Sequence, residues 1–402
     1  MARQSFGVFG VVPLVAAVLA GCAGAPNLSS DGLPSDIAGR PTLAAVTTRN
    51  VAPDPRAAPW FGTKRAEARI TQVRLTSPYM SGRFSMAATG LSDWKIQSVE
   101  PVSNLPVALA SGGTGGRDVL VYVHGFNTSF EGAALDAARL SNALGFRGDT
   151  VMFSWPSRGE ILGYMADRES ALWSRDALED TLNSLLSNPG IGRIHIVAHS
   201  MGGMLTVEAL RQVYATNSGY MNRFGAVVFA SPDIDIDGFS ASVRRMGDFH
   251  RRMTVVSSTD DRALAISASL AGGRRVGRVE KARLEELGIK VVDASGLSSG
   301  LLRHDLFLSD SHVQKVIATA IEDSRRGGAM AAPVSIRTLQ HGQAAAAAAP
   351  PPAQALPPAQ ALPAAQALPP AQALPPAQAV SPPPAVAAEP AAALPPSEPL
   401  PQ

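Results

Sequence analysis

The sequence has a single cysteine, Cys22, among its 402 residues. A disulfide within the chain is therefore excluded, and the mature domain cannot depend on one. A strong charge of either sign is missing as well, because the formal net charge at pH 7 is only +2. A balance this mild gives no support to a nucleic-acid-binding function.

Patterns that bind metals or phosphates are also missing. No cluster of side chains has the spacing of zinc ligands, and no glycine-rich loop resembles a phosphate cradle. We therefore expect neither a metal nor a cofactor. Arginines do gather in two places, where a solvated basic face is the ordinary interpretation and contact with an anionic lipid or substrate is the alternative. The two groups are Arg244, Arg245, Arg251 and Arg252, and Arg274, Arg275 and Arg278.

The N-terminus lacks an apolar run long enough for a comfortable membrane span. One cation, Arg3, precedes an apolar stretch over residues 6–20 that glycine and proline interrupt. We interpret residues 1–21 as a secretory signal peptide. The stretch closes with Leu19, Ala20, Gly21 and Cys22, which is similar to the lipobox of bacterial lipoproteins; a chance cysteine in a signal peptide is the alternative.

The resemblance to lipoproteins implies a location. The cysteine would become the lipidated N-terminus, and Ala23 after it implies sorting to the outer membrane, facing the periplasm. Acyl chains contribute about 0.8 kcal/mol per buried methylene, so more than one chain holds a protein stably on a bilayer. We therefore expect a membrane as a partner, with residues 22–42 forming the lipidated end and a flexible linker.

The C-terminal residues 327–402 form a tail, of which 344–402 are nearly all Ala, Pro, Gln and Leu with recurring PPAQAL. Proline at this density cannot continue a helix or a sheet ladder. We expect a disordered tail, either passive or in contact with the cell envelope.

Between these ends, in residues 43–326, short apolar runs typical of strands alternate with stretches whose apolar residues recur at helical spacing. Such alternation predicts an α/β fold with a mostly parallel sheet covered by helices on both faces. Ligands in such sheets bind beyond the carboxyl ends of the strands. Strands are expected at 43–48, 70–76, 84–88, 95–102, 118–123, 150–155, 194–198, 224–230, 253–258 and 289–293, and helices at 130–144, 168–186, 203–213 and 310–322.

The stretch RIHIVAHSMGG, residues 193–203, places a serine between a strand and a helix. A sharp turn there would hold the hydroxyl of Ser200 clear of the backbone, with small residues two positions away on either side relieving the strain. Those positions hold Ala198 and Gly202. Glycine is usual at both, so the first position departs mildly from the pattern.

A serine nucleophile needs a base, and the base needs a group that holds its tautomer. In this architecture the chain order is serine, acid, histidine. Asp260 and Asp261 follow the strand expected at 253–258, and His304 follows the last strand. Asp233, after the preceding strand, is a further candidate for the acid. Any of these aspartates could instead be a helix N-cap.

Seven pieces of sequence together resemble the α/β-hydrolase superfamily, and within it a bacterial group long catalogued as a domain of unknown function. The resemblance covers roughly residues 43–322. The pieces are VYVHGFN from Val121, FSWPS from Phe153, YMADRESA from Tyr164, IHIVAHSMG from Ile194, ASPDID from Ala230, DRALAIS from Asp261, and His304.

This resemblance implies roles for single residues. Ser200 would be the nucleophile, His304 the general base and Asp261 the orienting carboxylate. The oxyanion would be held by the backbone N–H of Met201 and that of Phe126 or Asn127. His124 would brace the loop after its strand, or be a buried histidine with satisfied hydrogen bonds.

The remaining histidines are weaker candidates. We interpret His195 and His199 as structural, because both belong to the strand before the serine or to its turn. His312 lies on the last helix, and His250 has no clear role. Asp167 and Arg168 are expected to form an ion pair near the pocket.

These observations predict a lipid-anchored serine hydrolase that attacks an acyl ester or lipid through an acyl-enzyme, most simply an esterase or lipase. An acyltransferase is an alternative within the same chemistry. A non-catalytic envelope lipoprotein that keeps the fold as a scaffold is the alternative from another class.

Overall fold

The computed structural model describes residues 36–39, 41–77, 94–109, 116–160, 163–279, 281–297 and 304–326. The predicted signal peptide, Cys22, the strand expected at 84–88 and the tail at 327–402 lie outside the described residues. The end of the expected linker lies inside them. There helix α1 (Asp36–Gly39) buries Ile37 and Ala38 and so forms part of the fold.

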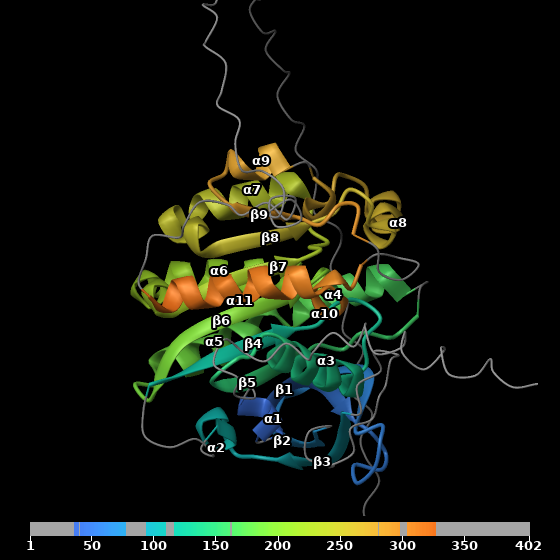
Figure 1. Ribbon diagram of the computed structural model, residues 1–402. Coiled ribbons are helices and arrows are strands. Elements are labelled where there is room, and N and C mark those ends of the chain that lie inside the picture. The colour runs from blue at the N-terminus through green and yellow to red at the C-terminus, as the bar shows by residue number, and fades with distance from the viewer. Residues whose placement is uncertain are drawn as a thin grey trace, which may run out of the picture. The chain divides into compact units, whose positions relative to one another are not determined.

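The described strands form one sheet in the order β3-β2-β1-β5-β4-β6-β7-β8-β9 (Figure 1). Strands β1 and β2 pair antiparallel, as do β2 and β3. The pairings along the rest of this order, β1-β5-β4-β6-β7-β8-β9, are all parallel. The predicted α/β fold is confirmed. The strands are β1 (Thr42–Val51), β2 (Phe61–Thr76), β3 (Lys95–Pro101), β4 (Arg117–Val123), β5 (Asp149–Ser154), β6 (Ile191–His199), β7 (Phe224–Ala230), β8 (Met253–Ser257) and β9 (Lys290–Asp293).

Helices connect the parallel strands. The α-helices after α1 are α2 (Leu105–Leu109), α3 (Phe130–Ala143), α4 (Tyr164–Trp173), α5 (Arg175–Ser187), α6 (Met201–Thr216), α7 (Ile236–Arg245), α8 (Arg262–Ala271), α9 (Lys281–Glu285), α10 (Leu306–Ser309) and α11 (Ser311–Arg325). Short 3₁₀ helices are η2 (Ser218–Arg223), η3 (Gly247–Arg252) and η4 (Val276–Arg278).

The single helix expected at 168–186 is wrong, because α4 and α5 meet at Ser174. The hydroxyl of Ser174 donates to the carbonyl of Ser170 and also lies 2.8 Å from the hydroxyl of Thr48 on β1. Such side-chain hydrogen bonds to the preceding turn often bend helices. The periodic leucines of 178–186 gave no sign of this junction.

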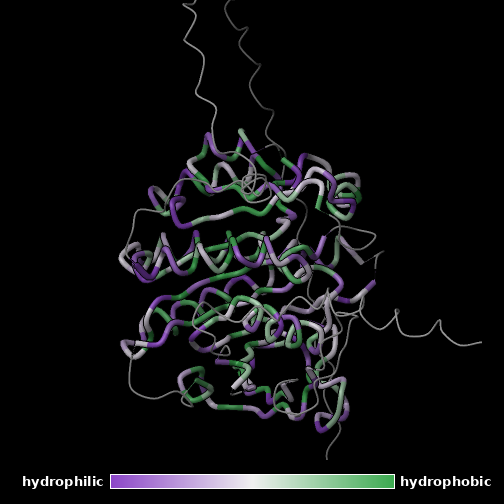
Figure 2. The backbone as a smooth tube through the Cα atoms, viewed as in Figure 1, coloured by the Kyte–Doolittle hydropathy of each residue, from purple (hydrophilic) through white to green (hydrophobic). Residues whose placement is uncertain are grey.

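Each central strand supplies two hydrophobic cores, one on each face of the sheet. On β4, Val119, Val121 and Val123 join one core, while Leu120 and Tyr122 join the other. Helices α4, α5, α6 and α7 cover the first face, and α3, α10 and α11 cover the second (Figure 1). Hydropathic colouring shows the apolar character of the central strands (Figure 2). Strands buried on both faces are expected to be almost continuously apolar.

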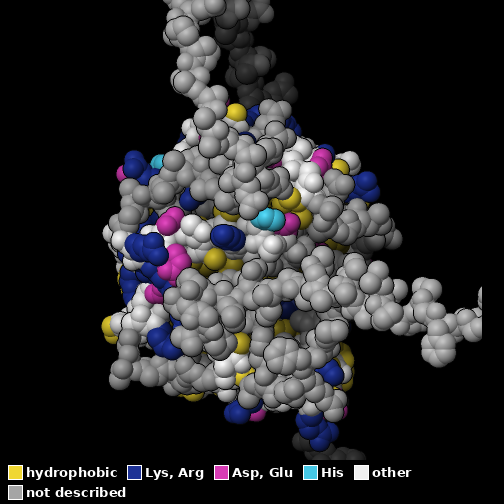
Figure 3. Space-filling view, in the orientation of Figure 1, with side chains coloured by type: hydrophobic (Ala, Val, Ile, Leu, Met, Phe, Trp, Pro, Cys, Tyr) yellow, Lys and Arg dark blue, Asp and Glu magenta, His cyan; other side chains and the backbone are white. Residues whose placement is uncertain are grey.

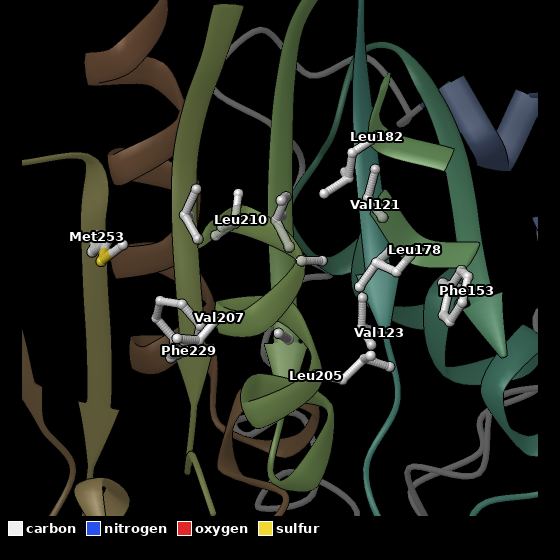
Figure 4. Close-up of a cluster of buried hydrophobic side chains, with 14 of the residues drawn as sticks. Val121, Val123, Phe153, Leu178, Leu182, Leu205, Val207, Leu210, Phe229 and Met253 are labelled. Atoms are coloured by element: carbon white, nitrogen blue, oxygen red, sulfur yellow. The ribbon is translucent and has the colours of Figure 1, made fainter. Parts of the chain in front are cut away.

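Figure 4 shows how the first core holds helix α6 against the sheet. Leu205, Val207 and Leu210 of α6 are buried with Val121 and Val123 of β4. This packing fixes the position of the helix that starts directly after Ser200.

The outer surface carries charges of both signs. In Figure 3, the visible Lys and Arg side chains are interspersed with Asp and Glu on this face. In the part of the chain that the structure describes, no helix combines the length and apolar character needed to cross a membrane.

Candidate active site

Ser200 occupies a strained turn between β6 and α6. Its φ of 51° and ψ of −120° lie where residues other than glycine are rarely found. Two backbone hydrogen bonds hold the turn: Ser200 N donates to Ala230 O at 2.9 Å, and Asp233 N donates to Ser200 O at 3.1 Å. Strain of this kind persists only where the surroundings enforce it.

Glycine is required two residues after the serine. A Cβ on Gly202 would overlap the main-chain carbonyl of His124 and approach that of Val123. The first turn of α6 therefore lies directly against the end of β4. This close approach places the loop that follows β4 beside Ser200, since a Cβ at Gly125 would lie 3.0 Å from Cβ of Ser200.

His304 and Asp261 are hydrogen-bonded to each other at this edge of the sheet. Nδ1 of His304 lies 2.7 Å from Oδ2 of Asp261. The carboxylate is fully buried, and its Oδ1 accepts a hydrogen bond from Leu264 N at 2.9 Å. Asp261 is thus both the N-cap of α8 and the partner of His304, so the two interpretations of this aspartate are compatible.

Burial alone would lower the pKa of His304. The hydrogen bond and charge of Asp261 outweigh burial, and with the charges of Asp305 and Asp233 they raise the pKa above its ordinary value. The imidazole is nevertheless 14% exposed, so its outer edge reaches solvent.

The two other candidate acids have different partners. Asp260 accepts a hydrogen bond from Gly296 N at 2.8 Å. Asp233 accepts hydrogen bonds from the hydroxyls of Tyr164 and Ser267, both at 2.8 Å. It also pairs with Nε of Arg275 at 3.2 Å. Of the three aspartates, Asp261 is the one hydrogen-bonded to His304.

Hydrogen bonding in the loop after β4 distinguishes between Phe126 and Asn127, the two candidates for the second oxyanion donor. Asn127 has a φ of 57°, and its N–H donates to Oγ of Ser157 at 2.9 Å. The backbone N–H of Asn127 is therefore already engaged in a hydrogen bond. Phe126 remains as the candidate of the pair, and its ring packs edge-on against Tyr164 at 5.7 Å.

His124 is buried within the structure that supports this loop. Its ring stacks on Trp155 with centroids 4.9 Å apart, and Trp155 Nε1 donates to His124 O at 2.8 Å. Burial and the nearby charge of Arg49 lower the pKa of His124 to about 3. The imidazole is therefore neutral at pH 7.

His199, at the end of β6, packs directly against His304. Its ring contacts that of His304 at 4.7 Å and that of Phe307 at the same centroid distance. Its Nε2 lies 3.6 Å from Oδ1 of Asp305. Burial and the neighbouring His304 lower its pKa, so it packs against His304 as a neutral ring.

The other histidines are distant from this arrangement. His195 accepts from Ala226 N at Nδ1, so its Nε2 is left to donate to Asp118. His312 faces Asp310, and His250 contacts the carbonyl of Gly247. Within the described ranges, no group of His, Cys, Asp and Glu side chains is arranged to hold a metal ion.

The expected pairing of Asp167 with Arg168 is wrong. Asp167 instead accepts hydrogen bonds from Oγ of Ser157 at 2.6 Å and from Arg158 N at 3.0 Å. Neighbouring residues on a helix do not face each other, which explains the error. Ser157 thereby connects Asp167 to the loop after β4.

Sequence reasoning also missed Arg49 on β1. It is buried and hydrogen-bonded to the loops after β4 and β5. The available signal was a charged residue within the otherwise uncharged strand TLAAVTTRNV.

Comparison with known proteins gives distant relatives. An uncharacterized protein of Nostoc sp., alr1448, is 27% identical over 122 residues, which is 24% of this chain and 32% of that protein. The chain thus matches only about a third of that relative's length.

Three similar solved structures have low sequence identity to this chain. A Pyrobaculum calidifontis esterase has 14% identity and a TM-score of 0.31, covering 55% of this chain and 79% of its own. Est1E from Butyrivibrio proteoclasticus has 12% identity and a TM-score of 0.36, covering 64% and 96%. A Trichoderma reesei cutinase in complex with a phosphonate inhibitor has 13% identity and a TM-score of 0.28, covering 52% and 77%.

The family assignment rests on a family model rather than on these structures. The model matches residues 112–321, just over half of the 402-residue chain. That range contains Ser200, Asp261 and His304, and it begins after β3. The chain belongs to the family described as alpha/beta hydrolase of unknown function (DUF900).

Proposed function

We propose that this protein is a serine hydrolase that cleaves an acyl ester through an acyl-enzyme on Ser200. The 2.7 Å hydrogen bond between His304 and Asp261 carries the proposal. It lies at the edge of the sheet where Ser200 occupies its strained turn. A buried carboxylate on Nδ1 of an imidazole is the arrangement that prepares the other ring nitrogen to accept a proton.

In the proposed reaction, Nδ1–H of His304 donates a hydrogen bond to the ionised carboxylate of Asp261, which leaves the lone pair on Nε2. Nε2 takes the proton of the Ser200 hydroxyl as Oγ bonds to the acyl carbon. The imidazolium then gives this proton to the alkoxy oxygen as the bond between that oxygen and the acyl carbon breaks, so the alcohol leaves and the acyl group stays on Oγ. In the second half, Nε2 takes a proton from water as the water oxygen bonds to the acyl carbon. The proton passes to Oγ of Ser200 as the bond between Oγ and the acyl carbon breaks, which releases the acid.

The negative charge that develops on the acyl oxygen needs donors held in advance. The backbone N–H of Met201, at the start of α6, is the first proposed donor, and the N–H of Phe126 is the second. Asn127 is left out because its amide donates to Ser157. Each such donor typically contributes about 10² to 10³ in rate.

The substrate class is proposed from chemistry and expected location. An ester has a better leaving group than an amide and needs no further residue to activate it. Cys22 would anchor the chain to the outer membrane through its acyl chains, beside lipid esters. Metabolic labelling with a fatty acid tests the anchor, because Cys22→Ser would abolish incorporation if it is correct.

Covalent labelling of the full-length chain with a fluorescent fluorophosphonate tests the nucleophile. We expect labelling that disappears in Ser200→Ala and in His304→Ala. Ser231→Ala is the matched control, because Ser231 is also buried, follows the neighbouring strand and has a positive φ of 45°. Labelling should persist in that control, and p-nitrophenyl esters then test the substrate class.

Absence of labelling at Ser200 in a folded protein would overturn the proposal. A scaffold without catalysis would then account for the fold. Labelling at Ser200 without release of free acid from any ester, together with formation of a new ester when an alcohol acceptor is added, would instead point to acyl transfer.

A further inference from the structure

Arg49 is a cation buried in the fold. It lies near the end of β1 and is only 1% exposed. Among the residues that the structure describes, no Asp or Glu forms an ion pair with it within 4.0 Å. Burying a charge is costly unless hydrogen bonds compensate. Its guanidinium must therefore be stabilised by neutral groups.

Those neutral groups come from three separate segments. Nε donates to Oγ of Ser154 at 2.9 Å, at the end of β5. One terminal nitrogen donates to the carbonyls of Ser157 at 3.1 Å and Gly62 at 3.2 Å. The other donates to the carbonyl of Thr128 at 2.6 Å. Arg49 thus joins the start of β2 to the loops that follow β4 and β5.

The same two loops hold the proposed oxyanion donor. Asn127 donates to Ser157, and Ser157 donates to Asp167. Arg49 therefore binds the loop after β4 twice, directly at Thr128 and indirectly through the segment of Ser157. In the sequence, Phe126 lies between Gly125, which approaches Ser200, and residues 127 and 128, which these hydrogen bonds hold.

The guanidinium remains charged at neutral pH. Burial lowers the pKa of Arg49 to about 10, with the charges of Glu131 and Asp167 acting in the opposite direction. A positive charge fixed behind the loop also favours negative charge developing in front of it. A hydrophobic side chain could fill this space but would supply neither the hydrogen bonds nor the charge.

We propose that Arg49 is a positioning residue that holds the loop after β4 so that the N–H of Phe126 faces the acyl oxygen. This inference rests on the proposed function. It also extends the catalytic unit beyond residues 112–321, because β1 lies before the range that the family model matches. The N-terminal strand is thus required for turnover as well as for packing.

The test compares Arg49→Met with Arg65→Met in the full-length chain. Arg65 lies opposite Arg49 in the register of β1 and β2, is exposed, and donates to Oγ of Ser170. Both variants lose one arginine from neighbouring positions, but only the first releases the loop. We expect kcat for a p-nitrophenyl ester to fall about 10²-fold in Arg49→Met with KM nearly unchanged. Arg65→Met should retain the wild-type kcat.

A second readout separates positioning from a general loss of structure. A trifluoromethyl ketone, which forms an oxyanion with the serine, should bind about 10²-fold more weakly to Arg49→Met. An ether analogue of the ester, which forms no oxyanion, should bind equally to both variants. If Arg49→Met does not fold, two other measurements replace it. One is kcat of Arg49→Lys, and the other is kcat of Arg49→Ala with guanidinium added at a sub-denaturing concentration. Each should recover part of the wild-type kcat.

The outcomes distinguish the two proposals. Ser200-dependent turnover in the wild type, with kcat of Arg49→Met within about threefold of it, would overturn the role of Arg49 alone. Equal loss of ketone and ether binding would overturn it too, because that result indicates a damaged pocket. Absence of Ser200-dependent turnover in the wild type would refute the proposed function and this inference together.

Discussion

Asp261 and His304 are 43 positions apart, yet Oδ2 of the first lies 2.7 Å from Nδ1 of the second. The two residues follow β8 and β9, which are parallel neighbours in the sheet. Parallel pairing brings the carboxyl ends of both strands to the same edge. Sheet topology therefore creates this contact between side chains from separate loops.

This relationship predicts different effects for two neighbouring aspartates. Asp261→Asn should lower kcat by about 10⁴-fold, because the amide favours the wrong tautomer of His304. Asp260→Asn is the matched control, because Asp260 accepts a hydrogen bond from the backbone N–H of Gly296 and is not bonded to His304, so kcat should remain near that of the wild type. Steady-state kinetics with one ester compares the two, and equal losses would contradict the assignment of the acid.

The raised pKa of His304 predicts the pH dependence of hydrolysis. The base must be neutral to accept a proton, so kcat/KM should rise with pH and reach half its maximum above the ordinary histidine pKa of about 6.5. Asp305 contributes to the raised pKa through its charge. Asp305→Asn should therefore move the acid limb to lower pH.

Because the Asp305 side chain is 68% exposed, salt should screen its effect and reduce the displacement. Asp310→Asn, at an aspartate that faces His312, should leave the profile unchanged. A pH–rate profile that Asp305→Asn does not move, or moves upward, would contradict the electrostatic origin given to the raised pKa.

The strained turn predicts a conflict between stability and activity at Ser200. A φ of 51° costs little for glycine but is unfavourable for residues with a Cβ. Ser200→Gly should therefore be more stable than Ser200→Ala by about 1 kcal/mol, although both lack the proposed nucleophile. Urea unfolding of the two variants measures the difference. A less stable glycine variant would show that the surroundings do not impose this strain.

The parts of the fold that could be predicted are those with local sequence patterns. The apolar run at 118–123 and the stretch around Ser200 gave strands close to β4 and β6 because both are buried on two faces. Helix α11 followed from its apolar periodicity. The break between α4 and α5 could not be predicted, since it depends on a contact of Ser174 with Thr48, which is distant in sequence.

The candidate site was predictable in kind but not in detail. A shift of one residue in the loop after β8 would exchange Asp260 and Asp261, and local sequence does not determine the loop's conformation. The choice between Phe126 and Asn127 likewise depends on Ser157. Arg49 could not be assigned, because its partners come from segments that only the folded sheet brings together. The catalytic roles of Ser200 and His304 remain predictions.

Two adjacent glycines at the start of α6 provide the last prediction. A methyl group on Gly202 would overlap the carbonyl of His124, which belongs to the backbone and cannot rotate away. On Gly203 it would lie 3.3 Å from Cβ of Pro232, which needs a shift of only a few tenths of an ångström, and 3.5 Å from Cδ1 of Ile234, which is an ordinary contact. Gly202→Ala should therefore displace the loop that carries Phe126, whereas Gly203→Ala should not.

We expect Gly202→Ala to lower the free energy of unfolding by about 1–3 kcal/mol, the range for overpacked sites, and to lower kcat together with stability. Gly203→Ala gains helix propensity of up to about 1 kcal/mol, which offsets its closer contacts. Chemical denaturation and ester hydrolysis on the same preparations compare the pair. If Gly202→Ala kept full activity, the loop after β4 could not be tied to the start of α6 as the proposed oxyanion site requires.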